Sequence, residues 1–147
     1  MGKPRKSKSV EENLIENYEM HTGLIIYADG SGDGRVALYL ETKDENGQLI
    51  SPSRQPKIVS SPATTNNEAE WEALLAALAE IKGYEPVLIL MDSRNVVEWF
   101  YGRFKTHNIR MRRYRDKVHE IVKKRALNVK LIWVRREDNK AGFRLEK

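Results

Sequence analysis

From Gly23 onward the chain carries three short aliphatic segments separated by turn residues. Residues 23–32, 35–44 and 55–63 are rich in β-branched and aromatic side chains, and a glycine cluster divides the first two. An Asn-Gly pair beginning at Asn46 lies between the second and the third. Since short turns join the segments, we expect three consecutive strands that pair as an antiparallel meander.

A helical pattern then replaces the strand pattern. Residues 68–82 place leucine and isoleucine side chains on one apolar stripe, and Gly83 is expected to end this helix. Residues 86–92 form a continuous apolar run ending in Asp92, which is typical of a strand buried on both faces at the centre of a sheet. The remaining expected elements are helices over 93–104 and 111–124, a strand over 128–135 and a short final helix from 137 onward.

The order of these elements predicts an α/β fold. It consists of a five-stranded mixed sheet, with three antiparallel strands followed by two parallel ones, flanked by helices. Residues 22–147 are expected to form this one domain. Residues 1–21 are expected to be separate: a basic tail followed by a short helix over 10–18, serving either as a mobile tail or as an accessory nucleic-acid arm.

Composition narrows the function classes. The 147 residues suit one domain, and the absence of cysteine removes disulfides, thiolate zinc sites and cysteine nucleophiles. No apolar run approaches a membrane span and no secretory signal begins the chain, so we expect a cytoplasmic protein. The net charge of +5 favours polyanionic partners such as nucleic acid, although charge alone is weak support.

Three acidic residues fall at the ends of predicted elements. Asp29 follows the apolar residues 24–28 within the first strand, Asp92 ends the apolar run 87–91, and Glu70 lies in the first turn of the long helix. A buried carboxylate without a partner is costly, and no Lys or Arg precedes Asp29 closely or occurs in residues 87–91. Oxygen ligands select Mg²⁺ or Mn²⁺, so the pattern indicates phosphoryl transfer with two metal ions.

Each acidic residue also has a purely structural interpretation. Asp29 in Asp-Gly-Ser-Gly resembles a turn residue, and Asp92 before Ser93 resembles a helix N-cap. Glu70 lies three residues after Asn67, which fits a capping-box-like helix start. The three residues together, at the ends of a β-β-β-α-β order, favour the metal site over three separate coincidences.

Four motifs resemble those of the type 1 ribonuclease H family. Residues 27–31 (YADGS) resemble its Tyr-Thr-Asp-Gly-Ser strand, and residues 65–70 (TNNEAE) its Thr-Asn-Asn-x-x-Glu helix start. Asp92-Ser93 resembles the Asp-Ser that closes its fourth strand. Residues 133–139 resemble its fifth strand and the Arg-Glu-x-Asn that follows. The resemblance covers residues 23–147 and is closest to the compact archaeal and phage forms that lack a basic extension.

The resemblance implies a role for each motif residue. Asp29, Glu70 and Asp92 would be the catalytic ligands of two Mg²⁺ or Mn²⁺ ions, and the substrate would be an RNA–DNA hybrid cut in its RNA strand by a monomer. The implied nucleic-acid contacts lie in the minor groove and at the 2′-hydroxyls, and they come from Asn66, Asn67, Gly30, Ser31 and Ser93.

The chain departs from the family at its fourth carboxylate. In an ungapped comparison Phe143 stands where the family has aspartate, and phenylalanine cannot bind a metal. Three explanations remain open. In the first, which we favour, Glu146 lies one helical turn further on and its side chain reaches back to the metal. In the second, Asp138 or Asn139 is the fourth metal ligand. In the third, one of the two metal ions is bound weakly. The loop histidine of many family members is also absent from this region.

A basic segment offers a substitute for the missing extension. Residues 104–115 include Arg110, Arg112 and Arg113 beside aromatic side chains, which fits contact with phosphates, although a solvated helix face is the alternative. The three tryptophans, Trp71, Trp99 and Trp133, are interpreted as packing residues.

Three functions compete. A metal-dependent endoribonuclease on RNA–DNA hybrids leads. An integrase or resolvase shares the expected fold but lacks the Thr-Asn-Asn-x-x-Glu element. A catalytically weak or inactive module that binds hybrids or double-stranded RNA stays open because of Phe143.

Overall fold

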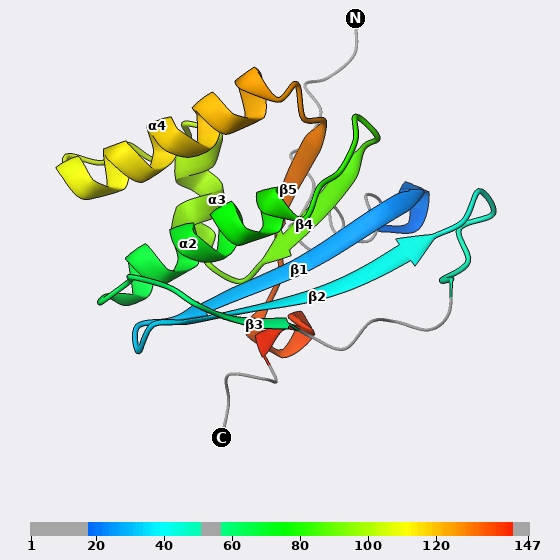
Figure 1. Cartoon of the computed structure of the whole chain (residues 1–147), viewed down its shortest axis with the longest axis horizontal. Helices are drawn as coiled ribbons and strands as arrows, with labels where there is room; N and C mark the ends of the chain where they lie inside the picture. Colours follow the sequence, from blue (N-terminus) through cyan, green and yellow to red (C-terminus); the bar gives the residue numbers. More distant parts are fainter. Residues whose placement is uncertain (1–17, 51–56, 143–147) are drawn as a thin grey trace, which may run out of the picture.

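The computed structural model describes residues 18–50 and 57–142 (Figure 1). Its strands form a single mixed sheet in the order β3-β2-β1-β4-β5. The strands are β1 (Gly23–Ser31), β2 (Arg35–Lys43), β3 (Lys57–Ser60), β4 (Val87–Met91) and β5 (Val129–Trp133). The helices are α2 (Asn66–Ala79), α3 (Arg94–Phe100), α4 (Ile109–Lys124) and the short 3-10 helix η1 (Arg136–Asp138).

The pairing of the strands confirms the expected mixed sheet. β1 pairs antiparallel with β2, and β2 with β3, as a meander. β4 then pairs parallel with β1 on one side and with β5 on the other. All five residues of β4 are buried, as the continuous apolar run predicts.

Helices α2, α3 and α4 cover one face of the sheet. α2 packs on β1 and β2, and α4 packs on α2 (Figure 1). Between them the fully buried Trp71 ring stacks against Trp99 and Tyr114, with centroid separations of 6.3 and 6.4 Å. Trp71 and Trp99 are thus packing residues, as expected from the sequence.

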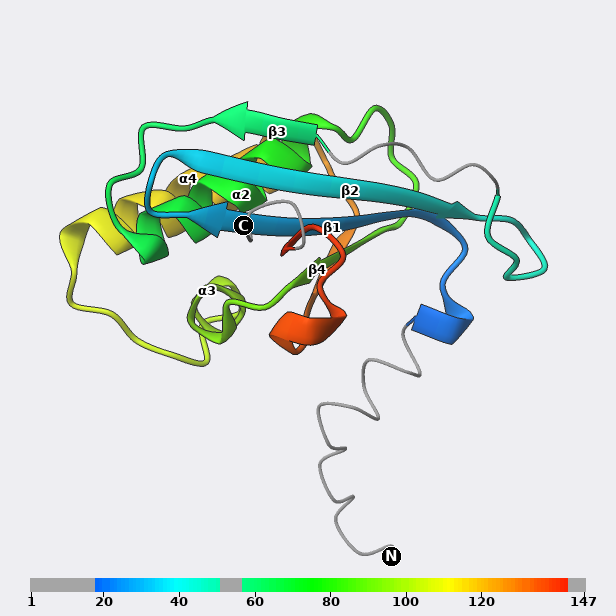
Figure 2. The same ribbon diagram turned by 90° about the horizontal axis from the view of Figure 1, so that it is seen from below.

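The opposite face of the sheet carries a second, smaller core. Ile25, Leu88 and Leu90 pack there against Val134 and Ala141 from the segment after β5. Figure 2 shows η1 and the helical residues 18–20 on this side, away from α2 and α4. The first described residues therefore contact the sheet from the side that the three longer helices leave open.

Several helix limits differ from the expected ones. α2 ends at Ala79 and not at Gly83. The Arg125 guanidinium donates to the carbonyl oxygens of Leu78 in its last turn and of Ile81 beyond it, at 3.0 and 2.5 Å. α3 ends at Phe100 rather than at 104.

Two further differences concern starts and termini. α4 begins at Ile109, two residues before the expected start, because the Asn108 side chain caps it. In the described part of the segment after β5, only η1 stands where a final helix is expected. The helix expected over 10–18 lies outside the described residues apart from Tyr18. No helix in the described ranges combines the length and apolarity needed to cross a membrane.

Candidate active site

Asp29 lies near the carboxyl end of β1, where the strand is paired on both sides. Its partner on β2 is Ala37, and the preceding Ala28 is paired with Met91 of β4. Asp29 is only 7% exposed, and its Oδ1 accepts a hydrogen bond from the Gly30 N–H at 3.0 Å. Asp29 is therefore a buried strand residue, and its interpretation as a turn residue is wrong.

Glu70 reaches the same place because α2 crosses β1 at very short range. A Cβ atom at Gly30 would lie 2.2 Å from the Ala69 carbonyl oxygen, closer than atoms can approach. Glycine at position 30 thus permits the close contact between strand and helix. The Gly30 N–H also donates to Glu70 Oε1 at 3.4 Å, so one amide faces both carboxylates.

Asp92 follows β4 directly and is brought beside Asp29 by the parallel pairing of β4 with β1. In parallel strands the carboxyl ends lie at the same edge of the sheet. From the neighbouring β5, the Trp133 indole N–H donates to the Asp92 carbonyl oxygen at 3.1 Å. Three adjacent strands thus fix the position of Asp92.

Other residues cap the two helices, so Glu70 and Asp92 are not helix-capping residues. Thr65 caps α2, since its hydroxyl accepts from the Glu68 N–H at 3.2 Å. Ser93 caps α3 in the same way through the Val96 N–H at 3.3 Å. Because α2 begins earlier than expected, Glu70 lies in its second turn and not in its first, and neither acidic residue is a cap.

The three carboxylates converge on one point. Asp29, Glu70 and Asp92 each offer an oxygen, and these atoms lie within 4.8 Å of one another. No other group of this kind occurs within residues 18–50 and 57–142. Glu70 Oε2 is buried and has no hydrogen-bond partner in the structure. An orphaned buried oxygen among like charges fits a bound cation, and an all-oxygen donor set suits Mg²⁺ or Mn²⁺.

Burial raises the pKa of all three carboxyl groups above the ordinary range. At Asp29 and Glu70 the loss of solvent is the largest cause of the raised pKa, and repulsion from the Asp92 carboxylate adds to it at both residues. At Asp92 burial again comes first, but the Arg136 charge and the Asn139 side chain oppose it. The cluster therefore resists full ionisation until a positive charge is supplied.

The segment after β5 borders the cluster without adding a carboxylate in its described part. Asp138 is paired with Arg135 at 2.9 Å instead. Asn139 is fully buried, and its side chain donates to the Ala28 carbonyl oxygen at 3.0 Å. A Cβ atom at Gly142 would lie 3.2 Å from Asp29 Oδ2. Phe143 and Glu146 lie outside the described residues, so the role of Glu146 stays a prediction.

The residues expected at the minor groove lie on the elements that carry the three carboxylates or next to them in sequence. Asn66 and Asn67 are exposed at the start of α2, and a Cβ atom at Gly32 would lie 2.8 Å from Asn66 Oδ1. Ser31 ends β1 and is half-buried. The Gly30 amide is directed at the carboxylates, and Ser93 caps α3 as described above.

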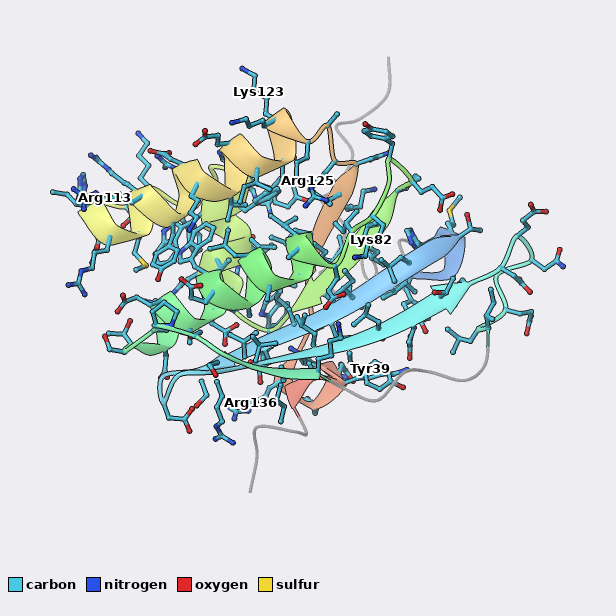
Figure 3. All side chains as sticks on the ribbon, viewed as in Figure 1. Tyr39, Lys82, Arg113, Lys123, Arg125 and Arg136 are labelled. Atoms are coloured by element: carbon cyan, nitrogen blue, oxygen red, sulfur yellow. The ribbon has the colours of Figure 1, made fainter. Side chains whose placement is uncertain are left out.

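The arginines of α4 lie beside the start of α2. Arg110 Nη1 is 3.7 Å from Oε2 of Glu68, which is itself buried in the first turn of α2. Arg112 donates to the Thr106 carbonyl oxygen at 2.9 Å, and Arg113 extends from α4 to solvent (Figure 3). The arrangement presents positive charge near Asn66 and Asn67.

Three supporting groups were not expected in these roles. The Trp133 indole holds the Asp92 backbone, Arg136 contributes charge, and Asn139 ties the last segment to β1. The Arg-Glu-x-Asn motif was a signal for two of them, because it follows the strand next to Asp92 in the sheet.

Comparison with known proteins gives consistent matches. A family model described as reverse transcriptase-like matches residues 28–145. The structure of LC11-RNase H1, isolated from compost by a metagenomic approach, was solved in complex with an RNA/DNA hybrid. It is 26% identical to this chain, with a TM-score of 0.66, and the match covers 83% of this chain and 92% of that one.

Two more distant structures show the same fold. RNase H1 from the halophilic archaeon Halobacterium salinarum is 23% identical, with a TM-score of 0.63 and coverage of 83% and 92% of the two chains. The N-terminal RNase H domain of a Mycobacterium tuberculosis protein is 23% identical, with a TM-score of 0.59 and coverage of 85% and 91%.

Proposed function

Since the chain belongs to the ribonuclease H family, whose reverse transcriptase-like model matches most of its length, we propose that it is a metal-dependent endoribonuclease that cuts the RNA strand of RNA–DNA hybrids. The observation that carries the proposal is the convergence of Asp29, Glu70 and Asp92 within 4.8 Å, with a buried Glu70 oxygen that has no partner. Such a cluster needs cations to be stable in its ionised form.

The three carboxylates would hold two divalent ions, Mg²⁺ or Mn²⁺, with Glu146 as a candidate additional ligand. When bound, such ions lower the pKa of water and stabilise the leaving 3′ oxygen of a phosphodiester. The protein itself contributes rigid placement, since the Gly30 amide and the Trp133 indole fix the positions of the acidic residues.

Substrate recognition follows from the surroundings of the cluster. Asn66, Asn67 and Ser31 would bind sugar and base edges in the minor groove, and Gly30 and Ser93 belong to the same contact surface. Arg110, Arg112 and Arg113 on α4 would bind phosphates. Recognition by shape and 2′-hydroxyl requires no base sequence. We propose that the protein acts as a cytoplasmic monomer.

A direct cleavage assay tests the proposal. The full chain is incubated with a labelled RNA–DNA hybrid, an RNA duplex and a DNA duplex, in Mg²⁺ and separately in Mn²⁺. Cleavage of the hybrid alone, and its loss in Asp29→Asn, is the expected result. Cleavage of DNA would instead favour an integrase-like activity.

The alternative is a module that binds hybrids or double-stranded RNA with weak or no cleavage. It is favoured by Phe143 at the family's aspartate position and by the pairing of Asp138 with Arg135 away from the cluster. Tight binding without cleavage in either metal would support it.

Comparison of Glu146→Gln with Asp138→Asn tests which residue is the fourth metal ligand. An unchanged cleavage rate and metal optimum in both variants would exclude both residues.

A further inference from the structure

An ion pair between the buried Glu41 and Lys140, whose side chain is 38% exposed, lies on the open face of the sheet, outside the carboxylate cluster. Glu41 of β2 is opposite Ile25 of β1, and its side chain is 3% exposed. It accepts hydrogen bonds from the Lys140 ammonium and, at 3.3 Å, from the Tyr18 hydroxyl. A carboxylate this deeply buried is tolerated only when it is paired, so Lys140 is strongly held at this point.

The aromatic rings and the carboxylate around the Lys140 ammonium favour a cation at this place. Lys140 Nζ lies 5.5 Å from the ring centroids of both Tyr27 and Tyr39. These two rings are neighbours across β1 and β2, in edge-to-face contact at 5.9 Å. Cation–π contact with two rings, together with the Glu41 carboxylate, gives Lys140 one favoured position.

Lys140 is followed and preceded by residues that touch the proposed metal ligands. Asn139 donates to the carbonyl oxygen of Ala28, the residue before Asp29, and its side chain hydrogen-bonds with Asp92. Position 142 is so close to Asp29 that a Cβ atom there would lie 3.2 Å from Oδ2. The segment 139–142 therefore forms one wall of the cluster.

Residues 139–142 belong to no long helix or strand that would fix their position. The three residues of η1 precede it, and within the wall the Asn139 carbonyl and side chain accept from the amides of Gly142 and Ala141 at 3.0 and 3.1 Å. The Lys140–Glu41 pair joins it to β2 across 99 positions of sequence. We propose that this ion pair positions residues 139–142 against Asp29 and Asp92 and thereby sets the affinity of the cluster for divalent cations.

The inference rests on the proposed metal site, and its test uses Mn²⁺ binding rather than cleavage as the first readout. Binding is measured by electron paramagnetic resonance of free Mn²⁺ on the full chain. Lys140→Met and Glu41→Gln are expected to weaken binding by about 10-fold, the lower end of the effect of residues that orient metal ligands. Lys140→Arg, which keeps the cation, should restore binding.

The matched control is Lys57→Met, which removes the exposed pair between Lys57 and Glu80 at 2.7 Å on the edge strand β3. It should leave Mn²⁺ affinity unchanged. In the cleavage assay, Lys140→Met should need more metal for half-maximal rate, while KM for the hybrid at saturating metal stays the same. A general loss of structure would alter both quantities.

If the single variants unfold, Mn²⁺ binding is measured on the double variant Glu41→Gln/Lys140→Met, because this variant leaves no unpaired buried charge. Weaker Mn²⁺ binding in a folded double variant supports the proposal, and wild-type affinity in a folded Lys140→Met, Glu41→Gln or double variant overturns it. A wild-type protein that binds Mn²⁺ but cuts no hybrid contradicts the proposed function and leaves this inference standing.

Discussion

At the scale of single residues, the site is defined by three carboxylates that repel one another in the metal-free protein. Asp29, Glu70 and Asp92 are close together, their pKa values are raised by burial, and one Glu70 oxygen is unpartnered. Like-charged groups buried together in this way lower the stability of the fold that carries them.

Asp29→Asn should therefore stabilise the metal-free protein while it abolishes cleavage. Removal of one negative charge is expected to add roughly 1 kcal/mol to the free energy of unfolding, or about 4 °C in Tm. Thermal unfolding in EDTA measures this, and the hybrid assay should show a loss above about 100-fold. A lower Tm in EDTA would mean that Asp29 has a stabilising partner.

The raised pKa values also predict an unusual pH dependence of stability. In the metal-free folded state the three carboxyl groups bind protons that the unfolded chain has already lost above about pH 4. The contribution of the cluster to stability is thus largest below that pH and is lost as pH rises through the raised folded-state pKa values.

Added Mg²⁺ should reverse the trend, because the metal binds the deprotonated groups. Urea unfolding across pH, with and without Mg²⁺, measures the difference. The gain from Mg²⁺ should grow with pH and should vanish in Asp29→Asn. A gain that is independent of pH would mean that Mg²⁺ binds elsewhere.

The acidic residues could be predicted from the sequence because each follows or begins an element with a clear pattern. The Lys140–Glu41 pair could not, since two residues 99 positions apart carry no local signal of contact. The same holds for the Trp133 indole, whose partner is a backbone carbonyl at Asp92. Side-chain contacts across a sheet depend on register, which a single sequence leaves open.

At the scale of elements, the decisive contact is the crossing of α2 over β1. It depends on position 30, where the space for a side chain is taken by the backbone of Ala69. Without this contact Glu70 cannot approach Asp29.

Gly30→Ala should displace α2 and lower the free energy of unfolding by about 2 kcal/mol, within the usual cost of overpacking. Mn²⁺ affinity should fall with it, because Glu70 moves with the helix. Gly83→Ala is the matched control, since a Cβ atom there meets nothing within 4 Å. Equal Tm values for the two variants would show that α2 adjusts freely.

The existence and type of most elements could be read from the sequence, while their ends could not. The apolar stripe of α2 predicted its buried side, but the Arg125 side chain that contacts its end comes from the turn after α4. A cap supplied from a distant segment leaves no trace near residues 66–79. The final segment differed for a related reason, because its described part forms only short 3-10 turns and is tied to the sheet by side chains such as Asn139.

At the scale of the whole molecule, the helix that packs on α2, α4, is basic, and α2 carries Glu70 of the carboxylate cluster. Lys and Arg exceed Asp and Glu by five over the chain, and α4 carries arginines at the end nearest the start of α2. Figure 3 shows Arg113 and Lys123 extending from α4 at its two ends.

Replacement of Arg110, Arg112 and Arg113 by alanine should weaken hybrid binding more at low salt than at high salt. The slope of log affinity against log salt should become shallower by up to about 3, one phosphate contact per arginine. Fluorescence anisotropy in the Asp29→Asn background measures binding without cleavage. Lys123 and Lys124, at the other end of α4, provide the control pair, and an equal effect there would point to diffuse attraction.

The central position of β1 has a consequence for folding kinetics. β1 pairs with β2 through a tight turn, whereas its other neighbour β4 follows α2 in the sequence. Because local contacts close faster than distant ones, we expect the β1–β2 hairpin to form first and the parallel β1–β4 pair late. Asp29 and Asp92 lie on the two sides of that late junction. Mg²⁺ should accordingly slow unfolding and leave the refolding rate nearly unchanged in stopped-flow measurements. The ion would then bind only after the fold is complete and hold β1 and β4 together. Equal effects of Mg²⁺ on the unfolding and refolding rates would mean that the β1–β4 pair already forms in the folding nucleus.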